Sequence, residues 1–157
     1  MKNVPVSIVI LLRRPSATQF EMWMQRRQAP GTLNNLWEFP GGKIEKNEKA
    51  IDAARREVFE EMGLDLSNIP LIDFKIYQYQ FEDRCISLNV YLAQLENVKS
   101  VGHIGEWFQI KYTVQSQNFK GKIPPANHQI IDELCCYLKK KFKSGEWDFS
   151  GENNGDG

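Results

Sequence analysis

Apolar residues fall in short, dense runs along the first third of the chain, a pattern typical of strands. Val6 to Leu12 is almost wholly apolar and β-branched, as in a central strand covered on both faces, and Arg13-Arg14-Pro15-Ser16 is expected to break it. Phe20 to Arg26 predicts a second strand. Leu36 to Phe39 predicts a third, which should end in a tight glycine loop at Pro40-Gly41-Gly42.

The period becomes helical from Ala50 to Met62. Apolar side chains recur there on one stripe, and Gly63 follows where a left-handed helix cap belongs. The stripe consists of Ile51, Ala54, Val58 and Met62. This range is the first predicted helix.

Strand patterns return near residues 71–81, 85–95 and 107–110, with Glu82-Asp83-Arg84 as the polar connection between the first two. Pro124-Pro125-Ala126-Asn127 then opens a second helical pattern. Its inward positions are Ile130, Ile131, Leu134 and Leu138, and Cys135 and Cys136 are placed among the core positions as small apolar fillers.

Composition limits the class of protein. With 157 residues, 41% of them hydrophobic, we expect one domain over residues 1–147 and a disordered tail at 148–157. Twenty Lys and Arg balance 20 Asp and Glu, so no global positive field would hold a nucleic-acid polymer. Three cysteines, two of them adjacent, argue against a disulfide framework, and the first apolar run is too short for a membrane span. We expect a cytoplasmic monomer.

Three glutamates gather on the first predicted helix. Glu57, Glu60 and Glu61 lie at i, i+3 and i+4, so a helix places them in one sector of about 100° beside the apolar stripe. Their repulsion costs roughly a few tenths of a kcal/mol per pair, which a bound cation would explain. Hard oxygen ligands suit Mg²⁺, with Mn²⁺ as a substitute.

Other residues nearby suit the same site. Arg56 can pair with Glu60 one turn further on, either to orient a metal ligand or as an ordinary helix salt bridge. Gly41 and Gly42 leave room for a backbone carbonyl to approach an ion.

The spacing of Gly42, five residues, Glu48, seven residues, then Arg56 to Leu64 resembles the Nudix box at every specified position. The resemblance to the MutT branch of this family covers about Val6 to Leu138. It implies an α+β fold, the Nudix α/β/α sandwich with a central mixed sheet. It also implies Mg²⁺ held by the Gly41 carbonyl, Glu57, Glu60 and Glu61.

Outside the box, the resemblance implies a nucleotide site. The strand before the box lies against the nucleotide in MutT-like enzymes, with Phe39 beside the base. Arg27 matches an arginine that reaches the phosphates, and alternation should send Arg26 to the opposite face. The implied substrate-binding residues are Arg27, Glu38, Phe39, Pro40, Gly41, Asp83, Arg84 and Asn127.

Asn127 has two interpretations. By its position after Pro-Pro-Ala it is suited to cap the following helix. By resemblance its amide hydrogen-bonds the purine edge. One carboxamide offers a donor and an acceptor, which distinguish an oxidised guanine, whose N7 carries hydrogen, from guanine. The resemblance favours the second interpretation.

Two positions depart from the family pattern. MutT carries a loop glutamate in the segment between Leu95 and Trp107, where this chain has no corresponding carboxylate. His103 is either a replacement base or a solvated loop residue. Asn47 stands where many relatives have Gly, and Asn tolerates a left-handed backbone.

The resemblance predicts an enzyme that converts a nucleoside triphosphate to the monophosphate and pyrophosphate. Glu57 and Glu60 are the candidate bases, with Glu57 favoured and Arg56 in support. The leading substrate is an oxidised purine nucleotide such as 8-oxo-dGTP, whose removal serves DNA replication fidelity. The alternatives are a pyrimidine triphosphate such as CTP or 5-methyl-dCTP, or a non-catalytic module that binds a nucleotide.

Overall fold

The computed structural model of the protein describes residues 2–16, 19–27, 35–96, 105–110, 119 and 122–144. These residues form two compact units. Unit 1 draws on Met1–Arg13 and Phe39–His103, and unit 2 draws on Arg14–Glu38 and Ile104–Asp148. The prediction of a single domain stays a prediction. No helix in the described ranges is long and apolar enough to cross a membrane.

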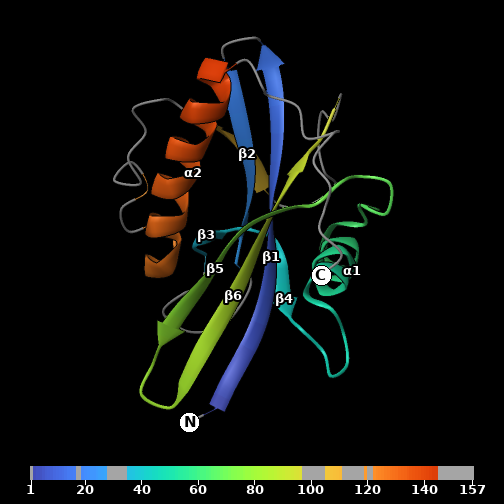
Figure 1. The fold of residues 1–157 in the computed structure, drawn as a ribbon, viewed down its shortest axis with the longest axis vertical. Helices are drawn as coiled ribbons and strands as arrows, with labels where there is room; N and C mark the ends of the chain where they lie inside the picture. Colours follow the sequence, from blue (N-terminus) through green and yellow to red (C-terminus); the bar gives the residue numbers. More distant parts are fainter. Residues whose placement is uncertain are drawn as a thin grey trace. The chain divides into compact units, whose positions relative to one another are not determined.

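Unit 1 is built on a mixed sheet. Its strands are β1 (Lys2–Ser16), β4 (Gly41–Lys43), β5 (Ile72–Gln80) and β6 (Arg84–Gln94). β1 runs parallel to β6 and antiparallel to β4, and β5 pairs antiparallel with β6. Figure 1 shows the short β4 beside β1, with the helix α1 next to it.

The apolar run in β1 forms the core of unit 1, and residues 7–12 are all buried. The expected break at Arg13 to Ser16 is wrong, because β1 continues to Ser16. The φ angle of proline fits an extended strand, and its missing N–H is tolerated near the end of a strand. Pro15 is therefore accommodated in β1 without ending it.

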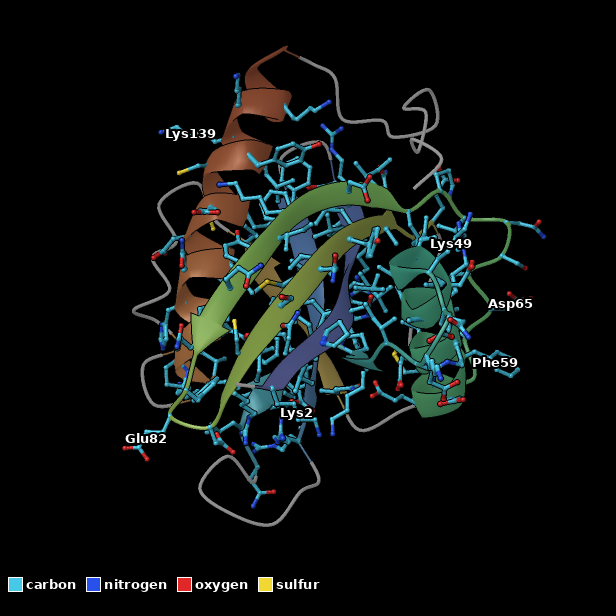
Figure 2. All side chains as sticks on the ribbon, turned by 60° about the horizontal axis from the view of Figure 1, so that its bottom comes forward. Lys2, Lys49, Phe59, Asp65, Glu82 and Lys139 are labelled. Carbon is cyan, nitrogen blue, oxygen red and sulfur yellow. The ribbon has the colours of Figure 1, made fainter. Side chains whose placement is uncertain are left out.

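The helix α1 (Ala50–Met62) has the predicted bounds. Its buried residues are Ala53, Ala54, Val58 and Met62, and the hydroxyl of Ser7 in β1 donates to the Ala50 carbonyl at 2.7 Å. Gly63 has φ 67° and donates its N–H to the Phe59 carbonyl, which confirms the predicted cap. Phe59 itself is 58% exposed and points outward from α1 (Figure 2).

Unit 2 contains β2 (Gln19–Arg26), β3 (Trp37–Glu38), β7 (Gly105–Ile110) and the helix α2 (Pro125–Ser144). β2 pairs antiparallel with both β3 and β7. The predicted strand from Leu36 to Phe39 is confirmed only at its two central residues.

The buried side of α2 contains the predicted residues Ile130, Ile131, Leu134 and Leu138. Cys135 is buried, but Cys136 is exposed, so its placement in the core is wrong. Leu134 and Cys135 are both buried, and a further turn of about 100° takes Cys136 off the buried side of the helix. The three cysteines are free. The predicted tail at 148–157 lies outside the described residues.

Candidate active site

Gly41 and Gly42 lie on β4, directly against β1. Gly41 pairs with Ile8, and Gly42 pairs with Ser7. A Cβ at Gly41 would lie 2.7 Å from the Ile8 Cα, so the close approach of the two strands requires glycine. The tight loop expected at these residues is wrong, because pairing with β1 draws them into a strand.

The carboxyl groups of Glu57 and Glu61 lie against the two glycines. A Cβ at Gly42 would lie 2.5 and 2.6 Å from the carboxylate oxygens of Glu57, so only glycine leaves room for this group. The Gly41 N–H donates to Oε2 of Glu61 at 3.3 Å. The structure therefore brings the glutamates of α1 and the glycine pair together.

Arg56 lies at the centre of a hydrogen-bond network on α1. Its Nε and Nη2 donate to the Glu48 carboxylate at 2.8 and 3.0 Å. Its Nη1 donates to Glu57 at 2.9 Å and to Glu60 at 3.2 Å. The predicted pairing of Arg56 with Glu60 is confirmed, and the same guanidinium also holds Glu57. Nη2 donates in addition to the Lys43 carbonyl at 3.0 Å, which ties α1 to β4.

Glu48 is the strongest partner of Arg56 in this network, a contact that the helical spacing did not predict. Hydrogen bonds from Arg56 and from the backbone N–H of Glu45 lower the pKa of Glu48 to about 2. The pKa of Arg56 is raised, first of all by its hydrogen bond to Glu48. Glu48 is a specified position of the box, which was the available signal. It precedes α1, however, where reasoning from i,i+4 pairs does not apply.

The residues suit a divalent cation in their chemistry. The glutamates and the Gly41 carbonyl supply hard oxygen donors, and the missing Cβ of Gly42 leaves space beside the Glu57 carboxylate. As the side chains stand, no three acidic, histidine or cysteine side chains among the described residues are grouped to hold one ion. Glu57 and Glu60 are bonded to Arg56, so an ion must share or replace these bonds.

Arg27 and Glu38 form an ion pair in unit 2. Nη1 of Arg27 donates to Oε2 of Glu38 at 3.1 Å. Burial raises the pKa of Glu38, against the lowering effect of Arg27. Nε of Arg27 is buried, and no described residue accepts its hydrogen bond. The neighbouring Arg26 instead lies 4.5 Å from the centre of the Trp37 ring, so the two arginines have different partners.

Asn127 is the third residue of α2, because the helix begins at Pro125. The capping interpretation is therefore wrong. Asn127 is 8% exposed, and its backbone N–H donates to the Pro124 carbonyl at 2.9 Å. Its side-chain oxygen and nitrogen are not among the fully buried polar atoms of the described residues that lack a hydrogen-bond partner.

Asp83 and Arg84 lie at the turn of the β5–β6 hairpin, whose neighbouring Glu82 projects outward in Figure 2. Their side chains are 73% and 46% exposed and lie 3.3 Å apart. Arg84 pairs with Lys2 of β1, whereas Gly41 pairs with a position six residues further along β1, a separation of about 20 Å. The structure does not bring this pair next to the carboxylates of α1.

Four further residues named from the sequence are Phe39, Pro40, Asn47 and His103. Asn47 has φ 65°, which confirms its left-handed backbone. Phe39 is buried at 4% exposure, and the carbonyl of the buried Pro40 accepts the N–H of Val9 at 2.9 Å. Contact of these two residues with a base stays a prediction. His103 lies outside the described residues.

Known proteins resemble the chain in sequence and in structure. A sequence profile of the NUDIX domain matches residues 2–131. The chain is 32% identical to the 8-oxo-dGTP diphosphatase of Escherichia coli (strain K12) over 137 residues, 85% of this chain and 98% of that protein. It is 32% identical to the RNA pyrophosphohydrolase of Bartonella henselae over 116 residues, 69% of this chain and 62% of that protein. The crystal structure of the C. elegans Ap4A hydrolase matches with a TM-score of 0.67 and 19% identity, covering 88% of this chain and 99% of that one.

The structural match shows the fold, which is the Nudix α/β/α sandwich with a mixed sheet that the sequence predicts. The profile spans most of the chain, and the Escherichia coli relative aligns over nearly its whole length. The relatives are named as diphosphatases and pyrophosphohydrolases, which agrees with the carboxylates and the arginine gathered on α1. The chain belongs to the NUDIX domain family and is a Nudix hydrolase.

Proposed function

We propose that this Nudix hydrolase cleaves a nucleoside triphosphate to the nucleoside monophosphate and pyrophosphate. The observation that carries the proposal is the packing of the Glu57 and Glu61 carboxyl groups against Gly41 and Gly42. Mg²⁺, or Mn²⁺ in its place, would be held there by the Gly41 carbonyl, Glu57, Glu60 and Glu61, and would supply charge neutralisation and a more acidic water.

Glu57 is the proposed base for the attacking water. Its carboxylate is fixed by Arg56 on one side and by the close approach of Gly42 on the other. The side chain of Glu57 is 17% exposed, compared with 56% for Glu60. A base must be held at a defined position relative to the proton it accepts, and Glu57 meets this condition better.

The proposed substrate is an oxidised purine nucleotide such as 8-oxo-dGTP. Asn127 on α2 is 8% exposed and carries a carboxamide, whose paired donor and acceptor suit recognition of a base edge. The name of the Escherichia coli relative, 8-oxo-dGTP diphosphatase, supports the same substrate. The role proposed is removal of oxidised nucleotides in the cytoplasm before DNA replication uses them.

Arg27 is the proposed phosphate ligand. Its side chain is 39% exposed, so it can be reached from solvent. Only one of its nitrogens is engaged by Glu38, and a guanidinium can donate to a phosphate through the others.

A panel of nucleotides tests the proposal. The panel contains 8-oxo-dGTP, dGTP, CTP and 5-methyl-dCTP, with pyrophosphate and monophosphate measured separately in the presence of Mg²⁺. We expect 8-oxo-dGTP to have the highest kcat/KM and to give 8-oxo-dGMP and pyrophosphate. Equal kcat/KM for 8-oxo-dGTP and dGTP would rule out the oxidised-purine substrate, and a preference for CTP would assign a pyrimidine substrate.

The variant Asn127→Ala should lower the preference for 8-oxo-dGTP over dGTP by about tenfold or more, because a site built around a hydrogen bond discriminates through it. The matched control is Gln129→Ala, which removes an exposed carboxamide from the same helix. The control should keep the preference of the unmodified enzyme. An unchanged preference in Asn127→Ala would remove Asn127 from the base site.

A further inference from the structure

Three aromatic rings pack in series in unit 2. The ring of Trp37 on β3 lies 5.0 Å from that of Phe108 on β7, and Phe108 lies 5.6 Å from Phe119, both in edge-to-face arrangements. Arg26 of β2 stacks over Trp37. The rings therefore join β3 and β7 to Phe119, which precedes α2 in the chain, and Arg26 adds a contact from β2.

Trp37 and Phe119 are also linked through backbone hydrogen bonds to Lys122, which lies shortly before α2. The Trp37 N–H donates to the Lys122 carbonyl at 2.7 Å, and the Lys122 N–H donates to the Phe119 carbonyl at 2.7 Å. Five residues after Lys122 comes Asn127, whose own N–H bonds to Pro124. Trp37 is thus bonded directly to Lys122, and its ring is linked to Phe119 through the ring of Phe108.

We propose that Trp37 is a positioning residue that sets the nucleotide preference of the enzyme by holding the segment ahead of α2, and with it the carboxamide of Asn127, in place. This inference rests on the proposed function, because it assigns to Trp37 control over the base contact of Asn127. β3 has only two residues, so its ladder with β2 provides little restraint. The packing of Trp37 against Phe108 and the stacking of Arg26 on Trp37 provide the remaining restraint on β3.

A role in stability alone would give a different result. If Trp37 only stabilised the fold, its loss would lower the melting temperature and affect all nucleotides alike. If it positions Asn127, its loss changes the ratio of kcat/KM for 8-oxo-dGTP to that for dGTP. A displacement of about 1 Å at a recognition group is enough to change rates by up to about a hundredfold.

The experiment measures this ratio in Trp37→Leu, Trp37→Phe and Phe108→Leu, together with the melting temperature of each. Trp37→Leu and Phe108→Leu remove the ring contact from opposite sides, so either one decides the matter if the other does not fold. We expect both to lower the ratio by about tenfold while turnover of dGTP is kept. Trp37→Phe, which keeps a ring, should restore most of the ratio.

The matched control is Trp107→Leu. Trp107 is half-buried, as Trp37 is, and lies in the same unit, but its ring packs on Trp23 at 5.5 Å. This variant should lose stability and keep the ratio. In a background of Asn127→Ala, Trp37→Leu should cause no further loss, since the two changes act through one contact.

The two proposals fail in different ways. An unmodified enzyme without preference for 8-oxo-dGTP over dGTP overturns the proposed substrate and this inference with it. A clear preference that Asn127→Ala removes, but that Trp37→Leu and Phe108→Leu leave intact, overturns only the inference. Additive losses in the double variant also overturn it, because they show that Trp37 acts independently of Asn127.

Discussion

Arg56 connects the acidic residues of the site through a single guanidinium group. It forms two hydrogen bonds with Glu48 and one each with Glu57 and Glu60. The pairing with Glu60 was predictable from the helix, since the residues are four apart. The dominant bond to Glu48 was not, because Glu48 lies outside α1 and the connecting turn decides where its carboxylate points.

Replacing Arg56 by Lys tests this arrangement at the residue scale. Lysine keeps the charge but lacks the planar fork, so it cannot hold Glu48, Glu57 and Glu60 together. We expect kcat to fall about 10–100-fold, as for other residues that orient catalytic ligands. Steady-state hydrolysis of a nucleoside triphosphate measures the change.

The control for this variant is the adjacent Arg55→Lys. Arg55 donates to the carbonyls of Leu66 and Ile69, beyond the end of α1. Replacing Arg55 by Lys weakens these hydrogen bonds, so it should lower the free energy of unfolding by about 1 kcal/mol and leave kcat unchanged. Equal losses of kcat in the two variants would show that Arg56 has no special link to the site.

The lowered pKa of Glu48 predicts how stability depends on pH. The pKa falls from 4.5 in the unfolded chain to about 2 in the folded protein, so the ionised carboxylate favours the folded state. This contribution is fully present above pH 4.5 and is lost as the pH falls toward 2. Glu48→Gln should therefore flatten the decline of the melting temperature in this window. An identical decline in both proteins would contradict the assignment.

At the scale of elements, α1 and β4 differ in how far the sequence predicts them. The bounds of α1 followed from its apolar stripe and from Gly63, which are local signals. β4 was mistaken for a loop, because its strand character comes from pairing with Ile8 more than thirty residues earlier. In unit 2, the contact of Arg27 with Glu38 likewise depends on the pairing of β2 with β3.

Two glycine substitutions separate the fold from the site. Gly63→Ala puts a side chain on a left-handed residue with nothing within 4 Å of the new Cβ, so it should cost about 1 kcal/mol of stability and keep kcat. Gly42→Ala drives a Cβ into the Glu57 carboxylate and should lower kcat by about a hundredfold. Thermal unfolding and kinetics on both variants measure the difference. A Gly42→Ala enzyme with normal kcat would contradict the role given to this contact.

At the scale of the whole molecule, the proposed roles are divided between the two units. The carboxylates, Arg56 and the glycine pair belong to unit 1, whereas Arg27, Glu38 and Asn127 belong to unit 2. The family could be predicted from the box alone, because its spacing is specific. The environment of Asn127 could not be predicted, because its burial depends on packing in three dimensions.

The most direct test of the metal-dependent site is turnover as a function of Mg²⁺ in the unmodified enzyme and in Glu61→Gln. This change removes one ligand charge at nearly constant volume, and Glu106→Gln on β7 serves as an exposed control. We expect chelation of Mg²⁺ to abolish turnover. Glu61→Gln should lower kcat by at least about a hundredfold with an unchanged melting temperature, and Glu106→Gln should keep the kcat of the unmodified enzyme. Full turnover in Glu61→Gln, or turnover that persists without a divalent cation, would contradict the metal-dependent site.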